Sequence, residues 1–421
     1  MQGGRAERKT MTEQIGKIML DYTYYPGEDL YCDGVVEQEI LKIAKDCSSL
    51  EFPKIIEERK SWPILYHLSD LRENIVDWLP MDKSMKVLEV GSGCGAITGA
   101  LSRKAGEVTC IDLSKQRSLI NAYRHADCDN VTIHVGNFQD IEPVLPCDYD
   151  YVCLIGVFEY GQSYIGGETP FEDFYRIIKK HVKKGGKLVI AIENKFGLKY
   201  WAGCREDHLG TFFSGIEGYP DGGYVRTFSK RGLERIFENC GEKDYHFYYP
   251  YPDYKFMTIL FSDKRLPLIG ELSNNYRNYD RDRLQLFDEK NVFDALIEDE
   301  MFPMYSNSYM VVIGEDTEIA YSKYSNDRSL QKAIKTEIII EDGVKKLRKQ
   351  AASEYSAEHI RNIYTYYQKL SKRYEGSKLE INKCKLVDGA IPYVELEYIE
   401  GITLAEILDD YLKKGDIDSF K

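Results

Sequence analysis

The sequence predicts an α/β protein whose main domain is a doubly wound, mainly parallel sheet. An apolar strand at 86–90 runs directly into a turn at 91–95 that has glycine at every second position. A second strand, 108–112, ends in Asp112 about twenty residues after the loop, where a ribose diol would need an acceptor. Glycine permits left-handed backbone and close approach of a ligand. The loop and the acid together favour an adenosine-type ligand.

The segments before the first strand are expected to be a disordered N-terminus followed by a helical cap. Residues 1–20 are assigned as disordered because their start is polar and lacks apolar periodicity. Residues 21–80 are assigned to the cap, because apolar residues recur at helical spacing within 35–79. The Tyr-rich segment 22–33 around Tyr25 could stack on a sugar, since aromatic rings suit apolar sugar faces. A tyrosine-rich packing segment is an equally good interpretation.

The spacing of the glycines separates two kinds of nucleotide loop. Dinucleotide folds use G-x-G-x-x-G, whereas residues 89–95 resemble the E-x-G-x-G-x-G loop of class I S-adenosylmethionine-dependent methyltransferases. The segment 131–140 is similar to that family's third strand and adenine-contacting turn. Residues 150–155 and 183–192 resemble its fourth and fifth strands. The resemblance implies a Rossmann-like class I methyltransferase domain over residues 81–262, with a mainly parallel sheet of seven strands and S-adenosylmethionine as cofactor.

The same resemblance implies a set of cofactor-binding residues. The amino acid end of the cofactor also needs a positive group for its carboxylate, and Arg72, ahead of the first strand, is assigned to it by position. The other implied cofactor residues are Glu89, Gly91, Ser92, Gly93, Gly95, Asp112, Leu113, Asn137, Phe138 and Ile155.

Catalysis follows from the chemistry of the cofactor. The sulfonium already carries an activated methyl group, so the protein must mainly place an acceptor in line with it. A phosphate or carboxylate acceptor needs no base, whereas a hydroxyl acceptor gains from one. We assign Glu159, just after the fourth strand, and His208, in a long loop after the fifth, as catalytic candidates, with His67 as a third possible base. A purely structural role for each histidine stays open.

Composition excludes several classes of function. The chain has 421 residues, enough for two or three domains, and a net charge of −13 that argues against nucleic acid as a partner. Its ten cysteines form no C-x-x-C pair, so no metal site is expected. No apolar run approaches the ~20 residues of a membrane span. We expect a cytoplasmic protein that reaches the inner membrane face only through partners.

The C-terminal part has a different pattern. We assign 263–307 as a linker or accessory segment and 308–421 as a second, α+β domain of strands, one amphipathic helix at 353–374, further strands and an acidic hinge. This order resembles the N-terminal lobe of a protein-kinase-like fold. The resemblance implies Lys349 as the phosphate-binding lysine, Glu358 as its helix partner and residues 397–399 as the adenine-facing hinge.

Two departures put kinase activity in doubt. In place of a glycine-rich phosphate loop, residues 325–329 read Ser-Asn-Asp-Arg-Ser, and no H-R-D or D-F-G segment occurs before residue 421. The catalytic base and metal ligands of a kinase lie in those segments. The kinase-like part is therefore not expected to be active in this chain, which we interpret as a fragment.

A methyltransferase joined to a kinase-like lobe resembles the bifunctional enzymes that cap bacterial O-antigen and other surface polysaccharides. That resemblance implies methyl transfer to an oxygen of a bacterial glycan, either a sugar hydroxyl or a phosphate, with glycosyltransferases as further partners in polysaccharide biosynthesis. Two alternatives remain open. One is a methyltransferase for a small metabolite or a protein, and the other is a non-catalytic scaffold that binds S-adenosylmethionine.

Overall fold

The chain divides into two units, Met1–Ser322 and Lys323–Lys421. The computed structural model describes residues 11–29, 34–275, 281–325 and 327–420. Each unit has its own strands and helices, and we describe them separately.

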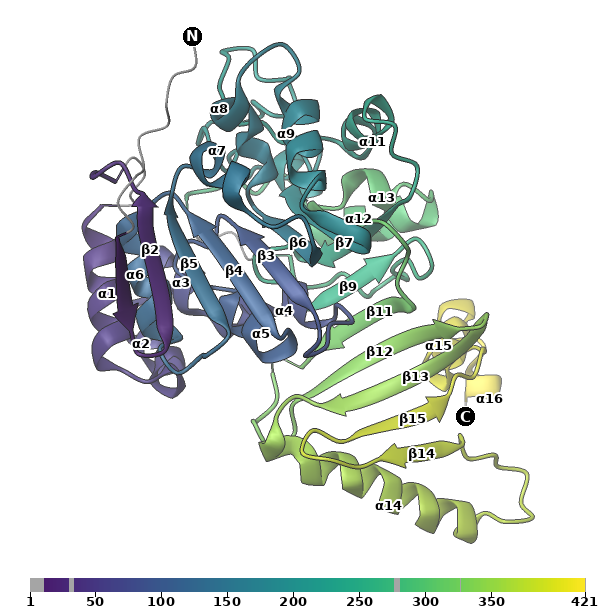
Figure 1. Cartoon of the computed structure of the whole chain (residues 1–421). Coiled ribbons are helices and arrows are strands. Elements are labelled where there is room, and N and C mark those ends of the chain that lie inside the picture. The colour runs from purple at the N-terminus through teal and green to yellow at the C-terminus, as the bar shows by residue number, and fades with distance from the viewer. Residues whose placement is uncertain (1–10, 30–33, 276–280, 326, 421) are drawn as a thin grey trace. The chain divides into compact units, whose positions relative to one another are not determined.

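The sheet of the first unit has a parallel centre and antiparallel edges. Its described strands lie in the order β1-β2-β5-β4-β3-β6-β7-β10-β8-β9-β11 (Figure 1). The run from β2 to β7 is parallel, and β10 lies antiparallel between β7 and β8. The predicted parallel core is confirmed, but the predicted count of seven strands is too low, because strands are added at both edges. The bounds are β1 (Thr12–Ile15), β2 (Ile18–Tyr24), β3 (Lys86–Val90), β4 (Glu107–Asp112), β5 (Val131–Gly136), β6 (Tyr149–Ile155), β7 (Val182–Glu193), β8 (Tyr245–Tyr251), β9 (Ile259–Ser262), β10 (Ser308–Ile313) and β11 (Ile319–Tyr324).

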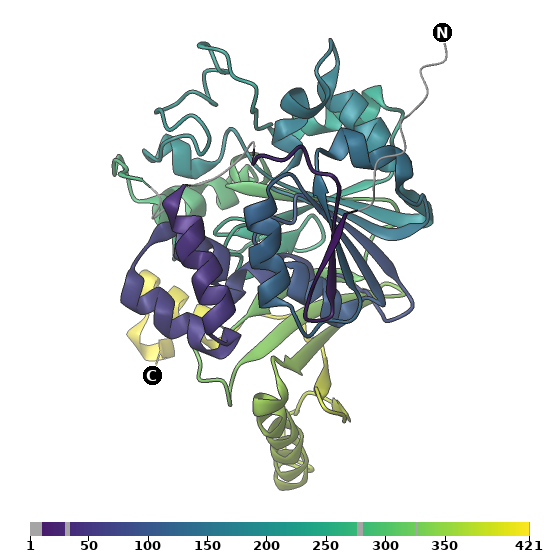
Figure 2. The same cartoon turned by 60° about the vertical axis from the view of Figure 1, so that its left-hand side comes forward.

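Helices cover this sheet in two groups. The first group, α1 to α3 with α6, stands in front of the sheet in Figure 2, and α7 to α9 form a second group at the top of Figure 1. Covered parallel strands read as continuous apolar runs, which is why β3 and β6 have almost no exposed residue. The bounds are α1 (Val35–Asp46), α2 (Phe52–Arg59), α3 (Trp62–Leu68), α4 (Asn74–Asp77), α5 (Thr98–Lys104), α6 (Lys115–Arg124), α7 (Phe138–Ile141), α8 (Gly161–Ile165), α9 (Pro170–Lys179), α10 (Leu198–Trp201), α11 (Lys230–Asn239), α12 (Glu289–Glu298) and α13 (Phe302–Tyr305).

The N-terminus corrects one prediction. Residues 11–20, expected to be disordered, contain β1 and the first three residues of β2, and the expectation for residues 1–10 lies outside the described residues. Ile18 and Leu20 are fully buried on β2, which pairs in parallel with β5. The residue between them, Met19, is apolar but exposed, so the sequence shows no clear alternation of apolar and polar residues here. Helices then occupy the predicted cap region from residue 35 onward, and their packing reaches Cys94 in the glycine loop.

The boundary between the two predicted domains is also wrong. The methyltransferase sheet does not close near Ser262, because β10 lies inside it, with Val311 paired to Ile190 on β7 and to Phe247 on β8. All six residues of β10 are buried. The predicted linker 263–307 contains α12 and α13, and it belongs to the first unit. A fully apolar strand has no period that tells which sheet it will join.

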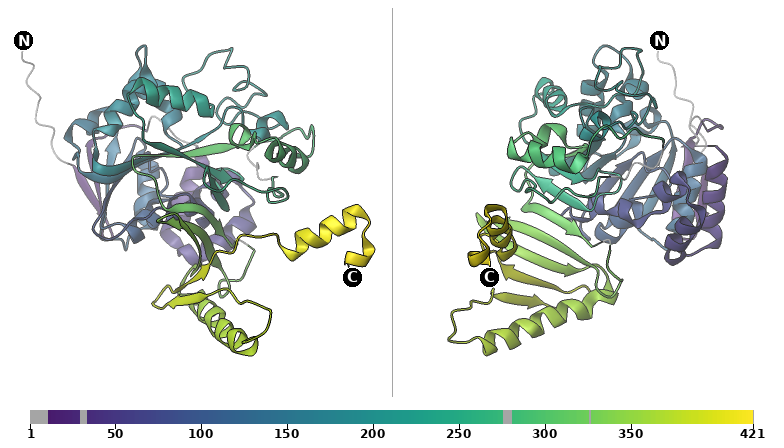
Figure 3. Two further views of the ribbon diagram at one scale, coloured as in Figure 1. Left: turned by 90° about the vertical axis from the view of Figure 1, so that its right-hand side faces the viewer. Right: turned by 180° about the vertical axis from the view of Figure 1, so that it is seen from behind.

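The second unit is an antiparallel sheet with one long helix. Its strands lie in the order β12 (Ile334–Glu341), β13 (Val344–Ala351), β15 (Tyr393–Glu397) and β14 (Cys384–Val387). Helix α14 (Ala357–Arg373) packs on this sheet through Ile360 (Figure 3). Two further helices follow, α15 (Leu404–Lys414) and α16 (Ile417–Phe420). The predicted succession of strands and helix is present, while its assignment as a kinase-like lobe stays a prediction.

Across the described part of the chain, no helix has both the length and the hydropathy that a membrane crossing requires.

Candidate active site

The glycine loop is fastened to the strand beside it. Gly91 N donates to Ile111 O at 2.8 Å, and Gly93 N donates to Asp112 Oδ2 at 2.7 Å. The other carboxylate oxygen of Asp112 accepts from Ser114 N at 2.9 Å. Burial raises the pKa of the Asp112 carboxyl. Asp112, which the sequence predicts to bind the ribose, therefore also fixes the conformation of the loop.

Three glycines of the loop have different surroundings. A Cβ at Gly91 would lie 2.5 Å from Val157 Cγ2, and one at Gly95 would lie 2.3 Å from Asn121 Oδ1. At Gly93 nothing lies within 4 Å, although all three have positive φ. The loop is thus held against the protein at its two ends and is open at its middle, where a ligand can approach the backbone.

A small pocket at this loop brings five of the predicted cofactor residues together, namely Arg72, Glu89, Gly91, Ser92 and Ile155. Ser92 Oγ and Arg72 Nε are buried and have no hydrogen-bond partner among the described residues. Buried polar atoms are normally satisfied, so these two atoms are available to a bound ligand.

Opposite charges face this pocket. Glu89 is 2% exposed, and burial raises its pKa to about 7 even though its Oε2 accepts a hydrogen bond from Thr98 Oγ1 at 2.7 Å. Arg72 donates from Nη1 to Lys255 O at 3.1 Å, and its guanidinium lies 4.3 Å from the centre of the Tyr66 ring. A carboxyl and a guanidinium in one pocket match a zwitterionic amino acid group.

The remaining predicted cofactor residues lie outside the lining of that pocket. Asn137 caps α7 by accepting from Gln139 N at 3.1 Å, and the Phe138 ring lies 5.9 Å from the Phe174 ring. Leu113 is half-buried directly after Asp112. Their assignment to the cofactor stays a prediction.

The structure brings the two predicted catalytic residues together. Glu159 follows β6 in a short turn, and His208 comes from the loop after β7. His208 Nε2 lies 3.9 Å from Glu159 Oε1, and its Nδ1 lies 3.4 Å from the hydroxyl of Tyr160. Neither His208 Nε2 nor Glu159 Oε2 has a hydrogen-bond partner among the described residues. Burial and the nearby Glu193 raise the pKa of the Glu159 carboxyl well above its usual range.

Sequence reasoning missed a buried charge cluster beside this pair. Glu193, at the end of β7, is fully buried and forms an ion pair with Lys255. Lys255 also pairs with Asp207, and Lys199 Nζ lies 3.1 Å from Asp207 Oδ2. Burial alone would raise the pKa of Asp207, but Lys199 and Lys255 lower it well below its usual value. The one available signal was Glu193 itself, a charged residue directly after the apolar run 188–192 of β7.

Three side chains of this region have the geometry of a cation site. One ligand atom each from Glu159, Glu193 and His208 lie within 4.8 Å of one another. Lys255 already supplies a positive charge to Glu193. The expectation of no metal site came from the cysteine and histidine spacing alone and stays untested.

Two other predicted contributors lie elsewhere. His67, on α3, has its ring 5.0 Å from the Tyr66 ring. Tyr25 donates to Asp29 Oδ1 at 3.2 Å, and Asp29 accepts from Lys115 N at 2.6 Å at the start of α6. The tyrosine-rich segment therefore fastens to α6, and no contact joins Tyr25 to His208 within the described residues.

In the second unit, the predicted nucleotide pair is not assembled. Lys349, half-buried on β13, and exposed Glu358, in the first turn of α14, share no ion pair or hydrogen bond in the described chain. Their assignment stays a prediction.

Comparison with known proteins defines the class of the first unit. Residues 88–188 match a family model described as a methyltransferase domain. The first unit therefore contains a methyltransferase domain, and S-adenosylmethionine is its cofactor.

The individual relatives are distant. Ribosomal RNA small subunit methyltransferase A of Streptococcus pneumoniae (strain P1031) is 27% identical over 153 residues, which are 30% of this chain and 50% of that protein. The same enzyme of Streptococcus equi subsp. zooepidemicus (strain MGCS10565) is 35% identical over 65 residues, which are 15% and 22% of the two chains. The chain thus spans half or less of the curated relatives that it matches.

Solved structures resemble the chain weakly. A methyltransferase in complex with the Haloferax volcanii Trm112 activator is 17% identical with a TM-score of 0.36, covering 66% of this chain and 98% of that one. A SAM-dependent methyltransferase from Archaeoglobus fulgidus is 12% identical with a TM-score of 0.35, covering 66% and 99%.

Proposed function

We propose that the chain transfers a methyl group from S-adenosylmethionine to an oxygen of a glycan, with His208 as the base for a hydroxyl acceptor. The observation that carries this proposal is the link between the cofactor pocket and the catalytic pair. Arg72 lines the pocket and donates to the backbone of Lys255, whose side chain pairs with Glu193. Glu193, Glu159 and His208 form one cluster.

The environment of Glu159 favours His208 as the base. Burial and the nearby Glu193 raise the pKa of the Glu159 carboxyl well above its usual range, which disfavours its charged form. His208 Nε2 is free to accept the hydroxyl proton as the new O–CH₃ bond forms and the S–CH₃ bond breaks. The imidazolium that results would keep this proton on Nε2, which lies 3.9 Å from Glu159 Oε1. A phosphate acceptor would need no proton transfer.

A glycan acceptor is supported by aromatic rings beside the base. The Tyr160 ring lies 5.5 Å from the His208 ring and 6.2 Å from the Tyr164 ring. Such faces suit the apolar side of a sugar, and the resemblance to polysaccharide-capping enzymes points the same way. A small metabolite, a protein, or binding without turnover remain alternatives. The streptococcal relatives are named as ribosomal RNA methyltransferases. An RNA acceptor fits poorly with this chain, because its net charge is −13.

The wider context is part of the same proposal. The second unit would be an inactive, kinase-like N-lobe, supported by its order of strands and helix. The protein would work in the cytoplasm with glycosyltransferases in bacterial polysaccharide synthesis.

The test compares His208→Asn with His246→Asn, since His246 lies on β8 outside the cluster. With glycans that offer only hydroxyls, H208N should lower kcat about 10²- to 10⁴-fold, the usual contribution of a general base. Its affinity for S-adenosylmethionine should be unchanged, and H246N should behave as the wild type. With phosphorylated glycans the loss should be small if the phosphate receives the methyl group.

Other outcomes would contradict the proposal. Equal activity of H208N and wild type on hydroxyl acceptors would exclude His208 as the general base. Binding of S-adenosylmethionine without methyl transfer to any glycan would instead favour the scaffold. Lys255 already neutralises Glu193, so we expect EDTA to leave the methyltransferase activity unchanged. If EDTA abolished the activity and added metal restored it, Glu159, Glu193 and His208 would instead be assigned as metal ligands.

A further inference from the structure

A second, larger pocket lies next to the candidate active site. It has a volume of about 380 Å³, and four of its lining residues are cationic, namely Lys195, Arg226, Arg231 and Arg235. No carboxylate lines it. We call it the basic pocket.

Most of this positive charge has no partner. Arg231 is neutralised by Glu238, which it contacts at 2.6 and 3.0 Å. The side chains of Lys195, Arg226 and Arg235 form no ion pair or hydrogen bond with the described residues, and Arg226 Nε is buried. Burial and the charge of Arg226 lower the pKa of Lys195. Lys195 Nζ lies 4.7 Å from the centre of the Phe196 ring, and Arg235 interacts electrostatically with Glu238. The cationic side chains that have no ion pair still repel one another, and an anion in the pocket would relieve this repulsion.

Helix geometry adds to this charge. Helix α11 begins at the basic pocket, with Ser229 as its N-cap accepting from Gly232 N at 3.2 Å. The positive end of a helix dipole favours anions. The pocket thus combines two unpaired guanidinium groups, one ammonium group and the start of a ten-residue helix.

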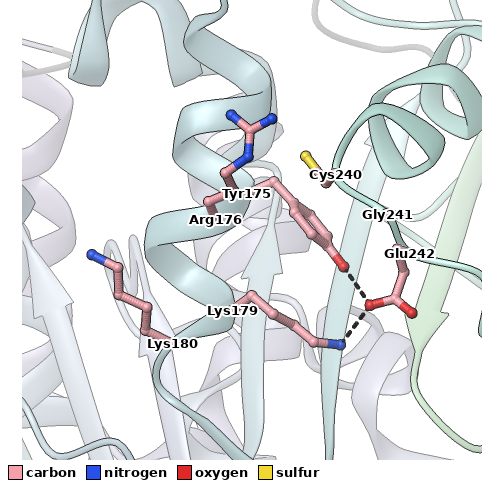
Figure 4. Close-up of a pocket in the computed structure, with 7 residues that line it drawn as sticks. All are labelled: Tyr175, Arg176, Lys179, Lys180, Cys240, Gly241 and Glu242. Atoms are coloured by element: carbon pink, nitrogen blue, oxygen red, sulfur yellow. Dashed lines mark hydrogen bonds and ion pairs between the residues drawn. The ribbon is translucent and has the colours of Figure 1, made fainter.

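A second pocket with cationic residues shows that such residues alone do not make an anion-binding site. Figure 4 shows the pocket that contains Arg176, Lys179 and Lys180, where Glu242 points inward and bonds to Lys179. Lys179 lies 2.9 Å from Glu242, Arg176 lies 2.8 Å from Asp173, and Lys180 lies 3.8 Å from a carboxylate on Glu142. The charges of that pocket are already compensated by the protein.

The basic pocket is attached to the segments that carry the candidate catalytic residues. Lys195 follows Glu193 by two residues, and Arg226 N donates to Glu159 O at 3.1 Å. Tyr219, which lines the pocket, donates to Glu206 Oε1 at 3.3 Å, and Glu206 Oε2 accepts from His208 N at 2.9 Å. A ligand held in the basic pocket would lie beside the acceptor region.

We propose that the basic pocket binds a phosphate group carried by the acceptor, at a point separate from the atom that receives the methyl group. Guanidinium groups donate in a fork that matches the oxygens of a phosphate, and the lysine adds a point charge. The identity of the ligand as the acceptor rests on the proposed function, whereas the anion site itself does not.

The experiment titrates the full chain with inorganic phosphate, a hexose 1-phosphate and the free hexose by calorimetry, at constant ionic strength set with chloride. The variants are Arg226→Gln and Arg235→Gln, with Arg176→Gln in the compensated pocket as the matched control. Phosphate and hexose phosphate should bind the wild type and R176Q saturably. Binding of phosphate and hexose phosphate should weaken at least tenfold in R226Q and R235Q. Binding of the free hexose should not differ between the wild type and these variants. Arg235 is exposed, so R235Q should fold even if R226Q does not.

The outcomes separate the two proposals. No saturable phosphate binding by wild type, or an equal loss in R176Q, overturns the anion site whatever the methyl-transfer assay shows. Binding of inorganic phosphate but not of the hexose phosphate overturns the acceptor assignment. Loss of hexose phosphate binding in R226Q and R235Q supports the site even if no glycan is methylated, in which case only the proposed function fails.

Discussion

At the scale of single residues, Glu89 makes stability depend on pH. Its folded pKa of about 7 lies above the ordinary value of 4.5 because the carboxyl is buried. The folded state therefore binds more protons than the unfolded state between these values, and the free energy of unfolding falls as pH rises through them. In Glu89→Gln this fall should shrink by about 3 kcal/mol. Urea unfolding of both proteins from pH 4.5 to 7.5 checks this, and parallel profiles would contradict it.

The glycine loop gives a second prediction at the same scale. Gly95→Ala forces a Cβ against Asn121 and should lower the free energy of unfolding by about 2 to 4 kcal/mol. Gly93→Ala meets no atom within 4 Å, so only its backbone strain of about 1 kcal/mol should remain. Urea unfolding measures the difference. Equal losses of unfolding free energy in the two variants would show that the Asn121 side chain moves away from a Cβ at residue 95.

Which site residues could be predicted depended on how local their signal is. The glycine loop and Asp112 were recognisable because a short motif carries them, and the pair of Glu159 and His208 followed from loops at the ends of adjacent strands. Lys199 and Lys255 were not recognisable, because each looks like an ordinary surface lysine in the sequence. Only the fold buries both of them against Asp207.

At the scale of elements, β10 decides where the first unit ends. Val311 is fully buried between β7 and β8. This pairing joins segments far apart in the chain, because β8 ends at Tyr251 and β10 begins only at Ser308. A chain of residues 1–262 lacks this strand and should aggregate, because the facing edges of β7 and β8 are left unpaired. Residues 1–322 should fold and bind S-adenosylmethionine. Size-exclusion chromatography and titration of both proteins test this, and a folded, ligand-binding 1–262 would contradict it.

Elements were predicted well where their signals are local. Ser229 illustrates such a local signal, because it stands directly ahead of a helical pattern and its hydroxyl accepts a hydrogen bond from Gly232 N. The strands β1 and β10 were misjudged because pairing across the sheet, which the sequence does not display, decides their place. The parallel core came out correctly because fully buried strands are apolar along their whole length.

At the scale of the whole molecule, the chain should behave as two units. Arg328 and Lys332 lie in an exposed segment between β11 and β12. Brief trypsin treatment should cut there first and release a first unit that still binds S-adenosylmethionine, because exposed, irregular segments are cleaved before packed ones. Mass spectrometry of the fragments checks the cut sites. Early cleavage within the first unit's sheet would contradict the division.

The position of β10 also has a consequence for synthesis on the ribosome. Its sheet neighbour β7 ends at residue 193, and β10 starts at residue 308. At about 5–20 residues per second, the nascent chain would wait roughly 6 to 23 s for that partner. During this interval the exposed side of β7 is a target for chaperones or for pairing with other nascent chains. Completion of the first unit is therefore timed by translation of a segment that lies outside the residues matched by the methyltransferase family.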